Sequence, residues 1–367
     1  MIDVDIRLTK DDFRLDTKFE TDTGLTALFG KSGSGKTTLI NAIAGLERPD
    51  EGRIEVDGNV LFDANAGINL PPEKRRLGYV FQESRLFPHL NVSKNLAYGM
   101  TLARPAEGGQ DFKRIVELLD LGALLTRRTR TLSGGERQRV AIGRALLANP
   151  RILLMDEPLA SLDAGRKAEI IPFIERLRDE LLLPIVYVSH AIEEVIRVAD
   201  TMVVMSDGRV AAGGSVEDIM SRLDLYPLTG RYETGAVIAA TVVGNDLDFG
   251  LTELSFAENR LWVPRLDLPL GTELRVRLRA RDVSLCLERP EKTSFLNILE
   301  GSVREMDAGD RPQVDVLVDV GAPVIARVSR RSVQTLALKP GMPVFVLIKA
   351  IAIDRHSLGR RGSASRG

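Results

Sequence analysis

The chain lacks several features that mark secreted, membrane-spanning or nucleic-acid-binding proteins. Its single cysteine, Cys286, excludes an intrachain disulfide and favours a reducing compartment. The 50 basic and 51 acidic side chains nearly cancel, which argues against a broad basic face for nucleic acid. No apolar run approaches the length needed to cross a bilayer, so another chain would supply any membrane spans. The 367 residues exceed what one hydrophobic core usually serves, so we expect two or three domains in a cytosolic protein.

A glycine-rich segment lies between the apolar residues 27–29 and a helix-like stretch at residues 39–44. It reads Gly30, Lys31, Ser32, Gly33, Ser34, Gly35, Lys36, Thr37 and Thr38. Glycines let backbone N–H groups converge on phosphate oxygens, and the dipole of the following helix points its positive end at the same anion. We expect Lys36 to reach the β- and γ-phosphates and the Thr37 hydroxyl to bind Mg²⁺. The segment therefore predicts a P-loop that binds a nucleoside triphosphate.

A second motif is the apolar run at residues 152–155, which ends in Asp156 and Glu157. Such a run suits a buried parallel strand that delivers two carboxylates at the carboxyl edge of a sheet, where ligands of open α/β sheets bind. Asp156 is then the natural partner of Mg²⁺, and Glu157 the residue that polarises an attacking water. The alternative is a buried strand that simply ends in an acidic helix cap.

A third motif combines a serine with paired glycines at the start of a helix, an arrangement that can hold an anion. It reads Leu132, Ser133, Gly134, Gly135 and Glu136. Alone, this segment could be an ordinary helix cap. The full order of motifs is the P-loop, Gln82, residues 132–136, Asp156-Glu157, Asp163 and His190. In that order the chain resembles the ATP-binding cassette family over roughly residues 1–225.

The resemblance implies a role for each matching residue. Gln82 would touch Mg²⁺ or water and sense a membrane partner, His190 would contact the γ-phosphate, and Asp163 would cross a dimer interface. The alternatives are a surface polar residue, a helix cap and a turn residue, respectively. Residues 133–135 of one subunit would cover the ATP held by the other, so the chain would act as a homodimer. Glu136 departs from the more frequent glutamine, but a carboxylate is favourable in a first helical turn.

The ATPase domain is expected to span residues 1–230. Its predicted fold is an α/β P-loop ATPase with a mainly helical subdomain at about 83–131. Pro172 falls inside an amphipathic pattern, which predicts a kinked or interrupted helix. Phe13 could stack on adenine or belong to the core, and the sequence leaves both readings open.

Past about residue 225 the pattern changes to alternating strands with turn residues between them. It predicts an all-β, OB-like C-terminal regulatory domain, with one β unit at 231–290 and a second at 291–354. The polar, Gly/Ser-rich residues 355–367 are expected to be a disordered tail.

Two further patterns lie in this C-terminal part. A faint repeat relates residues 271–280 to residues 341–350, although alternating patterns can also match by chance. Arginines alternate at positions 275, 277 and 279. We expect them on a solvated face of one strand rather than at a nucleic-acid site.

The second β unit resembles the small molybdate-binding β-barrel domain in three blocks, at residues 293–303, 328–341 and 346–350. The candidate oxyanion contacts share hydroxyl, amide or cationic groups and are Ser294, Asn297, Arg330, Ser332 and Lys349. Lys349 is the strongest candidate, because a cation on an apolar strand is costly unless it has an anion or reaches solvent. Phe295 and Leu296 stand where many family members have Ala-Arg, so a regulatory barrel that binds no anion is the alternative.

Together the resemblances imply the ATP-hydrolysing subunit of a molybdate or tungstate importer, with ATP and Mg²⁺ as cofactors. It would lie on the cytoplasmic face of the cell membrane, bound to integral-membrane permease subunits and indirectly to a periplasmic or extracellular binding protein. One alternative is the ATPase of another oxyanion importer, such as one for sulfate. Another is a soluble cassette ATPase that acts on nucleic acid or translation, but the balanced charge and single cassette argue against it.

Overall fold

The computed structural model describes residues 1–22, 24–102, 111–181, 183–229, 235–307, 311–353 and 358–360. The chain forms two compact units, Met1–Gly214 and Ser215–Arg361. The first unit ends before the boundary expected near residue 230. The difference arises because two short helices, α7 (Val216–Ser221) and α8 (Tyr226–Thr229), belong to the second unit.

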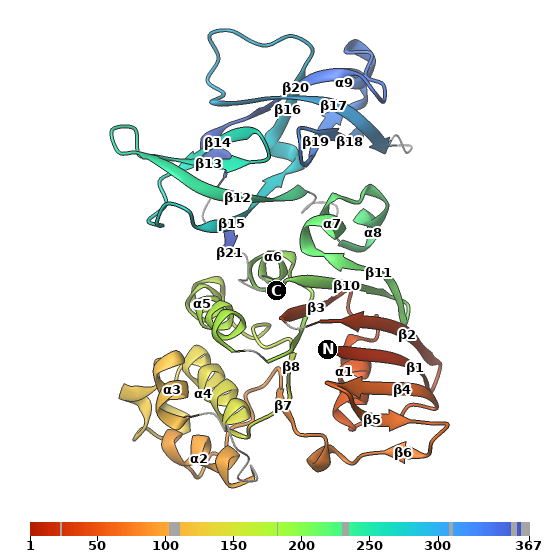
Figure 1. Ribbon diagram of the computed structural model, residues 1–367, viewed down its shortest axis with the longest axis vertical. Helices are drawn as coiled ribbons and strands as arrows, with labels where there is room; N and C mark the ends of the chain where they lie inside the picture. The colour runs from red at the N-terminus through yellow and green to blue at the C-terminus, as the bar shows by residue number, and fades with distance from the viewer. Residues whose placement is uncertain are drawn as a thin grey trace. The chain divides into compact units, whose positions relative to one another are not determined.

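The described part of the first unit is built on an eleven-stranded sheet, in the order β6-β5-β4-β1-β2-β11-β10-β3-β9-β8-β7 (Figure 1). Its strands are β1 (Ile2–Lys10), β2 (Phe13–Thr21), β3 (Leu25–Phe29), β4 (Glu51–Val56), β5 (Asn59–Asp63), β6 (Ile68–Asn69), β7 (Leu77–Val80), β8 (Ile152–Asp156), β9 (Ile185–Ser189), β10 (Thr201–Ser206) and β11 (Arg209–Ser215). Neighbouring strands β3, β9, β8 and β7 run parallel, so their carboxyl ends lie at one edge. Strands β3 and β9 are buried along their whole length, as near-continuous apolar runs in parallel sheets predict.

Helices of the first unit are α1 (Lys36–Ala44), α2 (Val92–Leu102), α3 (Phe112–Leu118), α4 (Gly134–Leu147), α5 (Ala164–Glu180) and α6 (Ile192–Val198). Figure 1 shows α2, α3 and α4 grouped beside β7. α2 and α3 lie within the range of the predicted helical subdomain, and the α/β class of the unit is confirmed. Within the part of the chain that the structure describes, each helix is too short or too polar to cross a bilayer.

The expected interruption at Pro172 is wrong, since α5 continues through it from Ala164 to Glu180. Proline removes one hydrogen bond to the carbonyl four residues earlier, that of Ala168. Both Pro172 and Ala168 are exposed, so water can satisfy that carbonyl. The helix therefore tolerates the proline on its solvent side.

A buried arginine closes the end of the helix that follows the P-loop. Arg75 is 2% exposed, and its Nη1 donates to the carbonyl oxygens of Ala42 (2.8 Å) and Ile43 (2.9 Å) in α1. Its Nε donates to the carbonyl of Leu70 at 2.7 Å and its Nη2 to Oδ1 of Asn69 at 2.9 Å. Burial lowers the pKa of Arg75 to about 10. The last carbonyl groups of a helix have no N–H partner within it, and the guanidinium donates hydrogen bonds to them. Its positive charge is also attracted to the negative end of the helix dipole.

Replacing Arg75 with Met should lower the free energy of unfolding by about 3 kcal/mol, because the carbonyl oxygens of Ile43 and Leu70 would lose a donor at about 1–3 kcal/mol each. Urea unfolding followed by circular dichroism measures the change. The matched control is Lys74→Met, which alters an exposed side chain in the same segment. Equal unfolding midpoints for the two variants would contradict the structural role given to Arg75.

The described part of the second unit holds two five-stranded sheets, in the orders β14-β13-β12-β15-β21 and β16-β20-β17-β18-β19. Their strands are β12 (Gly235–Asp246), β13 (Leu251–Phe256), β14 (Asn259–Pro264), β15 (Glu273–Arg279), β16 (Val283–Cys286), β17 (Asn297–Asp307), β18 (Gln313–Asp319), β19 (Pro323–Ser329), β20 (Pro343–Ile348) and β21 (Leu358–Arg360). A six-residue helix, α9 (Arg330–Thr335), follows β19.

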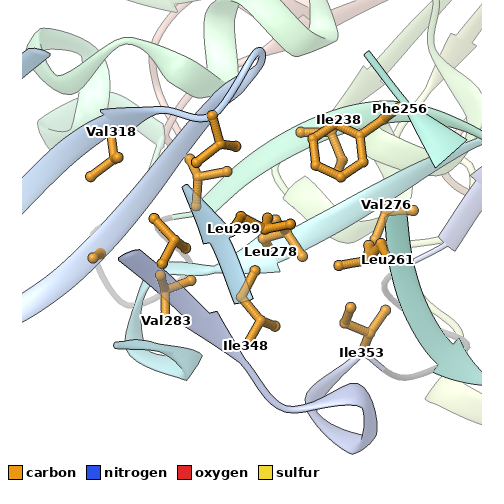
Figure 2. Packing of buried hydrophobic residues seen from close by; sticks show 14 of the residues in the cluster. Ile238, Phe256, Leu261, Val276, Leu278, Val283, Leu299, Val318, Ile348 and Ile353 are labelled. Carbon is orange, nitrogen blue, oxygen red and sulfur yellow. The ribbon is translucent and has the colours of Figure 1, made fainter. Parts of the chain in front are cut away.

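The two sheets are interleaved along the chain and share one core. β16 comes from the first predicted β unit but pairs with β20 of the second, and β21 returns to pair with β15. Figure 2 shows the shared core, in which Leu278 of β15 lies beside Leu299 of β17 and Val276 of β15 lies beside Leu261 of β14. The all-β class is confirmed, whereas β21 contradicts the expectation that the whole tail from residue 355 is disordered.

The repeat between residues 271–280 and 341–350 has a structural counterpart. Gly271 and Gly341 both have positive φ, at +81° and +84°. Each is followed by a strand, β15 or β20, and then by one turn of 3₁₀ helix. The matching order of turn, strand and short helix supports a repeated unit over a chance match.

The expectation of a solvated arginine stripe on β15 is wrong. Arg275 and Arg277 are each 3% exposed, because helices α7 and α8 belong to the same unit and α7 packs on the adjacent strand β12. Nε of Arg275 donates to Oε1 of Glu217 in α7 at 2.9 Å. Arg275 and Arg277 therefore lie inside the second unit, and Arg279 is partly exposed.

Candidate ATP site

The parallel strands of the first unit deliver the predicted motifs to one edge of the sheet. The P-loop follows β3, His190 follows β9, Asp156 ends β8, and Gln82 lies two residues after β7. These four strands are consecutive neighbours, so side chains from four distant parts of the sequence meet there. Ligands of open α/β sheets bind at this edge.

The P-loop has the geometry of an anion cradle. Gly33 and Gly35 have φ of +81° and +99°, in the left-handed region that favours glycine. Gly35 is the N-cap of α1 and makes no side-chain cap, so backbone N–H groups of the first turn remain available to a phosphate. A Cβ atom at Gly35 would lie 2.8 Å from the ring of Phe13, which packs against the loop.

The side chain of Lys36 is hydrogen-bonded to the backbone of this loop. It is 4% exposed, and its Nζ donates to the carbonyl oxygens of Gly30 at 2.7 Å and Lys31 at 2.8 Å. Burial lowers the pKa of Lys36, while Glu157 and Asp156 nearby act in the opposite direction. A buried ammonium group beside a glycine cradle fits the phosphates of a nucleotide.

Two oxygen groups that could hold Mg²⁺ lie together. The Thr37 hydroxyl donates to Oδ1 of Asp156 at 3.3 Å. Burial raises the pKa of Asp156, and the hydrogen bond from Thr37 opposes that shift. Among the described residues there is no cluster of three or more His, Cys, Asp or Glu side chains that could cage a metal. The donor set fits Mg²⁺, which is usually held by one or two protein oxygens together with substrate phosphates and water.

Glu157 and His190 lie beside each other. Nδ1 of His190 lies 3.2 Å from Oε1 of Glu157. The backbone N–H of Glu157 donates to the carbonyl of Val188 at 3.1 Å, and its φ is +43°, a conformation that costs a non-glycine residue about 1–3 kcal/mol. Strain of this kind is concentrated at functional sites.

A buried carboxylate that sequence reasoning missed supports the turn that carries His190. Oε2 of Glu194 accepts from the Tyr187 hydroxyl at 2.9 Å and from Ser189 Oγ at 2.8 Å, and its Oε1 accepts from Lys167 at 2.8 Å. Ser189 Oγ in turn accepts from the N–H of Ala191 at 3.0 Å. The N-cap of α6 is Ala191, so His190 does not serve as the helix cap.

Ser133 and Glu136 of the third motif form a capping box at the start of α4. Ser133 Oγ accepts from the N–H of Glu136 at 3.2 Å, and Oε2 of Glu136 accepts from the N–H of Ser133 at 2.7 Å. This reciprocal pair explains why the fold accommodates glutamate at position 136. Gly134 and Gly135 begin the helix directly after the serine.

The remaining predicted residues lie nearer the surface. Asp163 is the N-cap of α5, where its Oδ1 accepts from the N–H of Arg166 at 3.0 Å, and that hydrogen bond lowers its pKa. Gln82 is exposed beyond β7. Phe13 is partly buried against the core of the unit and also touches the P-loop, so both readings of this residue remain compatible with its position.

The structure does not gather the five candidate oxyanion contacts within one chain. Asn297 pairs with Ile348 at the start of the 11-residue strand β17, whereas Arg330 and Ser332 lie on α9, beside the other end of that strand. Ser332 is engaged locally, since its N–H donates to the N-cap Ser329 at 3.0 Å.

Of these five side chains, Asn297 is engaged within the fold, whereas Lys349 reaches solvent. Asn297 is 1% exposed, and its amide accepts from the N–H of Trp262 at 2.6 Å and donates to the carbonyl of Trp262 at 2.9 Å. Lys349 follows the end of β20, is exposed, and has its Nζ 5.7 Å from the centre of the Phe295 ring. Lys349 therefore avoids the cost of burial by reaching solvent. Ser294, which directly precedes Phe295, is also exposed.

Two protein families match this chain, one in each of its two units. The family described as ABC transporter matches residues 16–160, and the TOBE domain family matches residues 293–353. A solved structure of cbiO1 from Clostridium perfringens, described as part of the ABC transporter complex cbiONQ, has a TM-score of 0.52 at 24% identity. It covers 62% of this chain and 92% of that one, and it supports the fold.

Curated relatives match nearly the whole chain. The molybdenum import ATP-binding protein ModC of Paramagnetospirillum magneticum is 52% identical, over 97% of this chain and 98% of that protein. The protein of the same name from Mesorhizobium japonicum is also 52% identical, over 97% of this chain and 96% of the relative. The chain therefore belongs to the ABC transporter ATPases, in the family of molybdenum import ATP-binding proteins.

Proposed function

We propose that this chain hydrolyses ATP to drive molybdate import, as a homodimer held on the cytoplasmic face of the cell membrane by permease subunits. The observation that carries the proposal is the meeting of the P-loop, Asp156, Glu157 and His190 at one edge of the sheet, in a chain that also matches the TOBE family. A binding protein outside the membrane would deliver the anion to the permease.

Each residue of the site has a separate role in the transfer of the γ-phosphoryl group to water. The P-loop amides and Lys36 hold the phosphates, and Thr37 and Asp156 would hold Mg²⁺, with Gln82 as a further candidate oxygen ligand. Mg²⁺, when bound, neutralises charge on the β- and γ-phosphates. Glu157 accepts a hydrogen bond from the attacking water, and His190, whose Nδ1 lies beside that carboxylate, contacts the γ-phosphate. Residues 133–135 and Asp163 of a second subunit complete the site.

For the C-terminal unit we propose regulation by the transported anion. The support is the TOBE match over residues 293–353 and the names of the full-length relatives. Molybdate binding that favours the resting arrangement over the ATP-closed one would slow the ATPase. Because Lys349 and Ser294 are exposed, they are better placed to meet an anion than Asn297.

The test is ATPase activity of the complete permease complex in proteoliposomes, across titrations of molybdate and of sulfate. A coupling of about 1–3 kcal/mol predicts roughly 5–150-fold inhibition by molybdate. Lys349→Ala should relieve the inhibition, whereas Lys339→Ala, which also removes an exposed lysine, should not. Inhibition by sulfate alone would favour the sulfate importer, and no inhibition by either anion would reject the sensor role. An unchanged molybdate response in Lys349→Ala would reject that contact.

A further inference from the structure

Two aromatic rings and a guanidinium form a column on the strand that precedes Gln82. Tyr79 lies within β7, and Phe81 directly follows the strand. Their spacing of two residues puts both side chains on the same face. Their rings stack with centroids 4.2 Å apart and planes 27° apart. The Arg85 guanidinium also lies over the Phe81 ring, with Cζ 4.0 Å from the ring centre. A stacked cation and ring attract each other, so the three side chains support one another.

The inner end of the column reaches the candidate Mg²⁺ ligand. The Tyr79 hydroxyl lies 2.9 Å from Oδ1 of Asn41 and 3.4 Å from Oδ2 of Asp156, and its single proton is shared between these two acceptors. Oδ1 of Asp156 accepts from Thr37. The carboxylate is therefore held through both oxygens, by one hydroxyl from α1 and one from β7.

The outer end of the column is attached to the loop that follows Gln82. Arg85 has a φ of +42°, and its carbonyl accepts from Nη1 of Arg144 in α4 at 3.0 Å. The Arg144 guanidinium also lies over the ring of Phe87, 5.1 Å from its centre. The loop is thus held against α4, the helix that begins at residue 134.

We infer that Tyr79 is a positioning residue for Asp156, and that the Arg85–Phe81–Tyr79 column makes the orientation of this carboxylate depend on the loop after β7. The inference rests on the proposed role of Asp156 in holding Mg²⁺. A displacement of the loop that moves Arg85 shifts Phe81 and Tyr79 with it, and the Tyr79 proton passes between Asn41 and Asp156. The carboxylate then gains or loses one of its two hydroxyl donors.

The expected effect is on metal-assisted nucleotide binding. Partners that orient a metal ligand contribute about 10–100-fold to metal affinity. Because the Tyr79 proton is shared and its contact with Asp156 is the longer one, we place the effect of Tyr79→Phe at about tenfold. This variant keeps the ring stack and removes only the hydroxyl.

The experiment measures binding of a non-hydrolysable fluorescent ATP analogue to the full-length chain, in EDTA and across a Mg²⁺ titration. Tyr79→Phe should raise the half-saturating Mg²⁺ concentration by about tenfold and leave the affinity in EDTA unchanged. Arg85→Gln should shift the Mg²⁺ dependence in the same direction by a smaller factor. Tyr98→Phe, which removes a hydroxyl from an exposed tyrosine of α2, is the matched control and should match wild type.

The outcomes separate this inference from the proposed function. If Asp156→Asn abolishes the Mg²⁺ response and Tyr79→Phe leaves it intact, the proposed function stands and the positioning role is overturned. If Tyr79→Phe weakens binding equally in EDTA and Mg²⁺, its role is structural and the inference is also overturned. If wild type shows no Mg²⁺ response, the proposed role of Asp156 fails and the inference fails with it. A wild-type response in Arg85→Gln would remove the loop from the mechanism.

Discussion

A Glu157→Gln variant should bind ATP but turn it over at least about 100-fold more slowly than the wild-type chain, because a positioned general base contributes about 10²–10⁴-fold. The amide keeps the size of the side chain and can still lie beside His190. It cannot accept the proton of an attacking water as a carboxylate can. With closure intact and hydrolysis stalled, the variant should accumulate as an ATP-bound dimer, which size-exclusion chromatography with ATP and Mg²⁺ detects.

Glu193→Gln provides the matched control for this result. Glu193 is exposed in the first turn of α6, three residues after His190, and the same isosteric change there should leave turnover near wild type. A Glu157→Gln chain that hydrolyses ATP at the wild-type rate would remove Glu157 from the mechanism. A variant that neither hydrolyses nor binds ATP would show that the residue is needed to build the site.

Lys36→Ala should abolish nucleotide binding over the concentration range in which the wild-type chain saturates. Removing one partner of a buried charge pair costs about 2–5 kcal/mol, and each 1.4 kcal/mol is tenfold in affinity, so a loss of roughly 30-fold or more is expected. The loop also loses the donor shared by the carbonyl oxygens of Gly30 and Lys31. Equilibrium binding of a fluorescent ATP analogue measures the loss.

Lys18→Ala removes the same charge from an exposed ion pair with Asp5, far along the sheet from the P-loop, and should not change the affinity. Thermal unfolding of both variants shows whether the fold survives. Retained nucleotide affinity in a folded Lys36→Ala chain would contradict the assignment of Lys36 to the phosphates.

The meeting of the P-loop, Asp156 and Glu157 at one edge of the sheet was largely predictable, because these residues lie in short segments with a fixed local geometry. The P-loop glycines need particular backbone angles, and Asp156 with Glu157 needs only the end of a buried strand. Parallel strands then bring such segments together at one edge, whatever their separation in sequence. The supporting contacts were not predictable in the same way. Tyr79 and Glu194 look like ordinary strand and helix residues until neighbouring elements place Asp156 and Ser189 beside them.

In the second unit, sequence patterns identified strands but did not predict which side chains would be buried or paired. The alternation of apolar residues and arginines predicted the strand β15. It did not predict that Glu217 of a preceding helix would pair with Arg275. Likewise, Asn297 has a side chain suited to an anion, and only the fold reveals its engagement with the backbone of Trp262. Long-range packing decides which face of a strand is covered, and one strand's sequence does not contain that information.

The interleaving of β16 and β21 bears on how the chain folds as it leaves the ribosome. β15 lacks one of its neighbours until β21 emerges, and β16 must wait for β20, so neither sheet is complete until nearly all of the second unit has been made. At about 5–20 residues per second, the open edge of β15 persists for several seconds, a period in which it can pair with other nascent chains. The strands of the first unit are all present by Ser215. The ATPase unit can therefore fold during synthesis, whereas the second unit completes its sheets only near the end of synthesis.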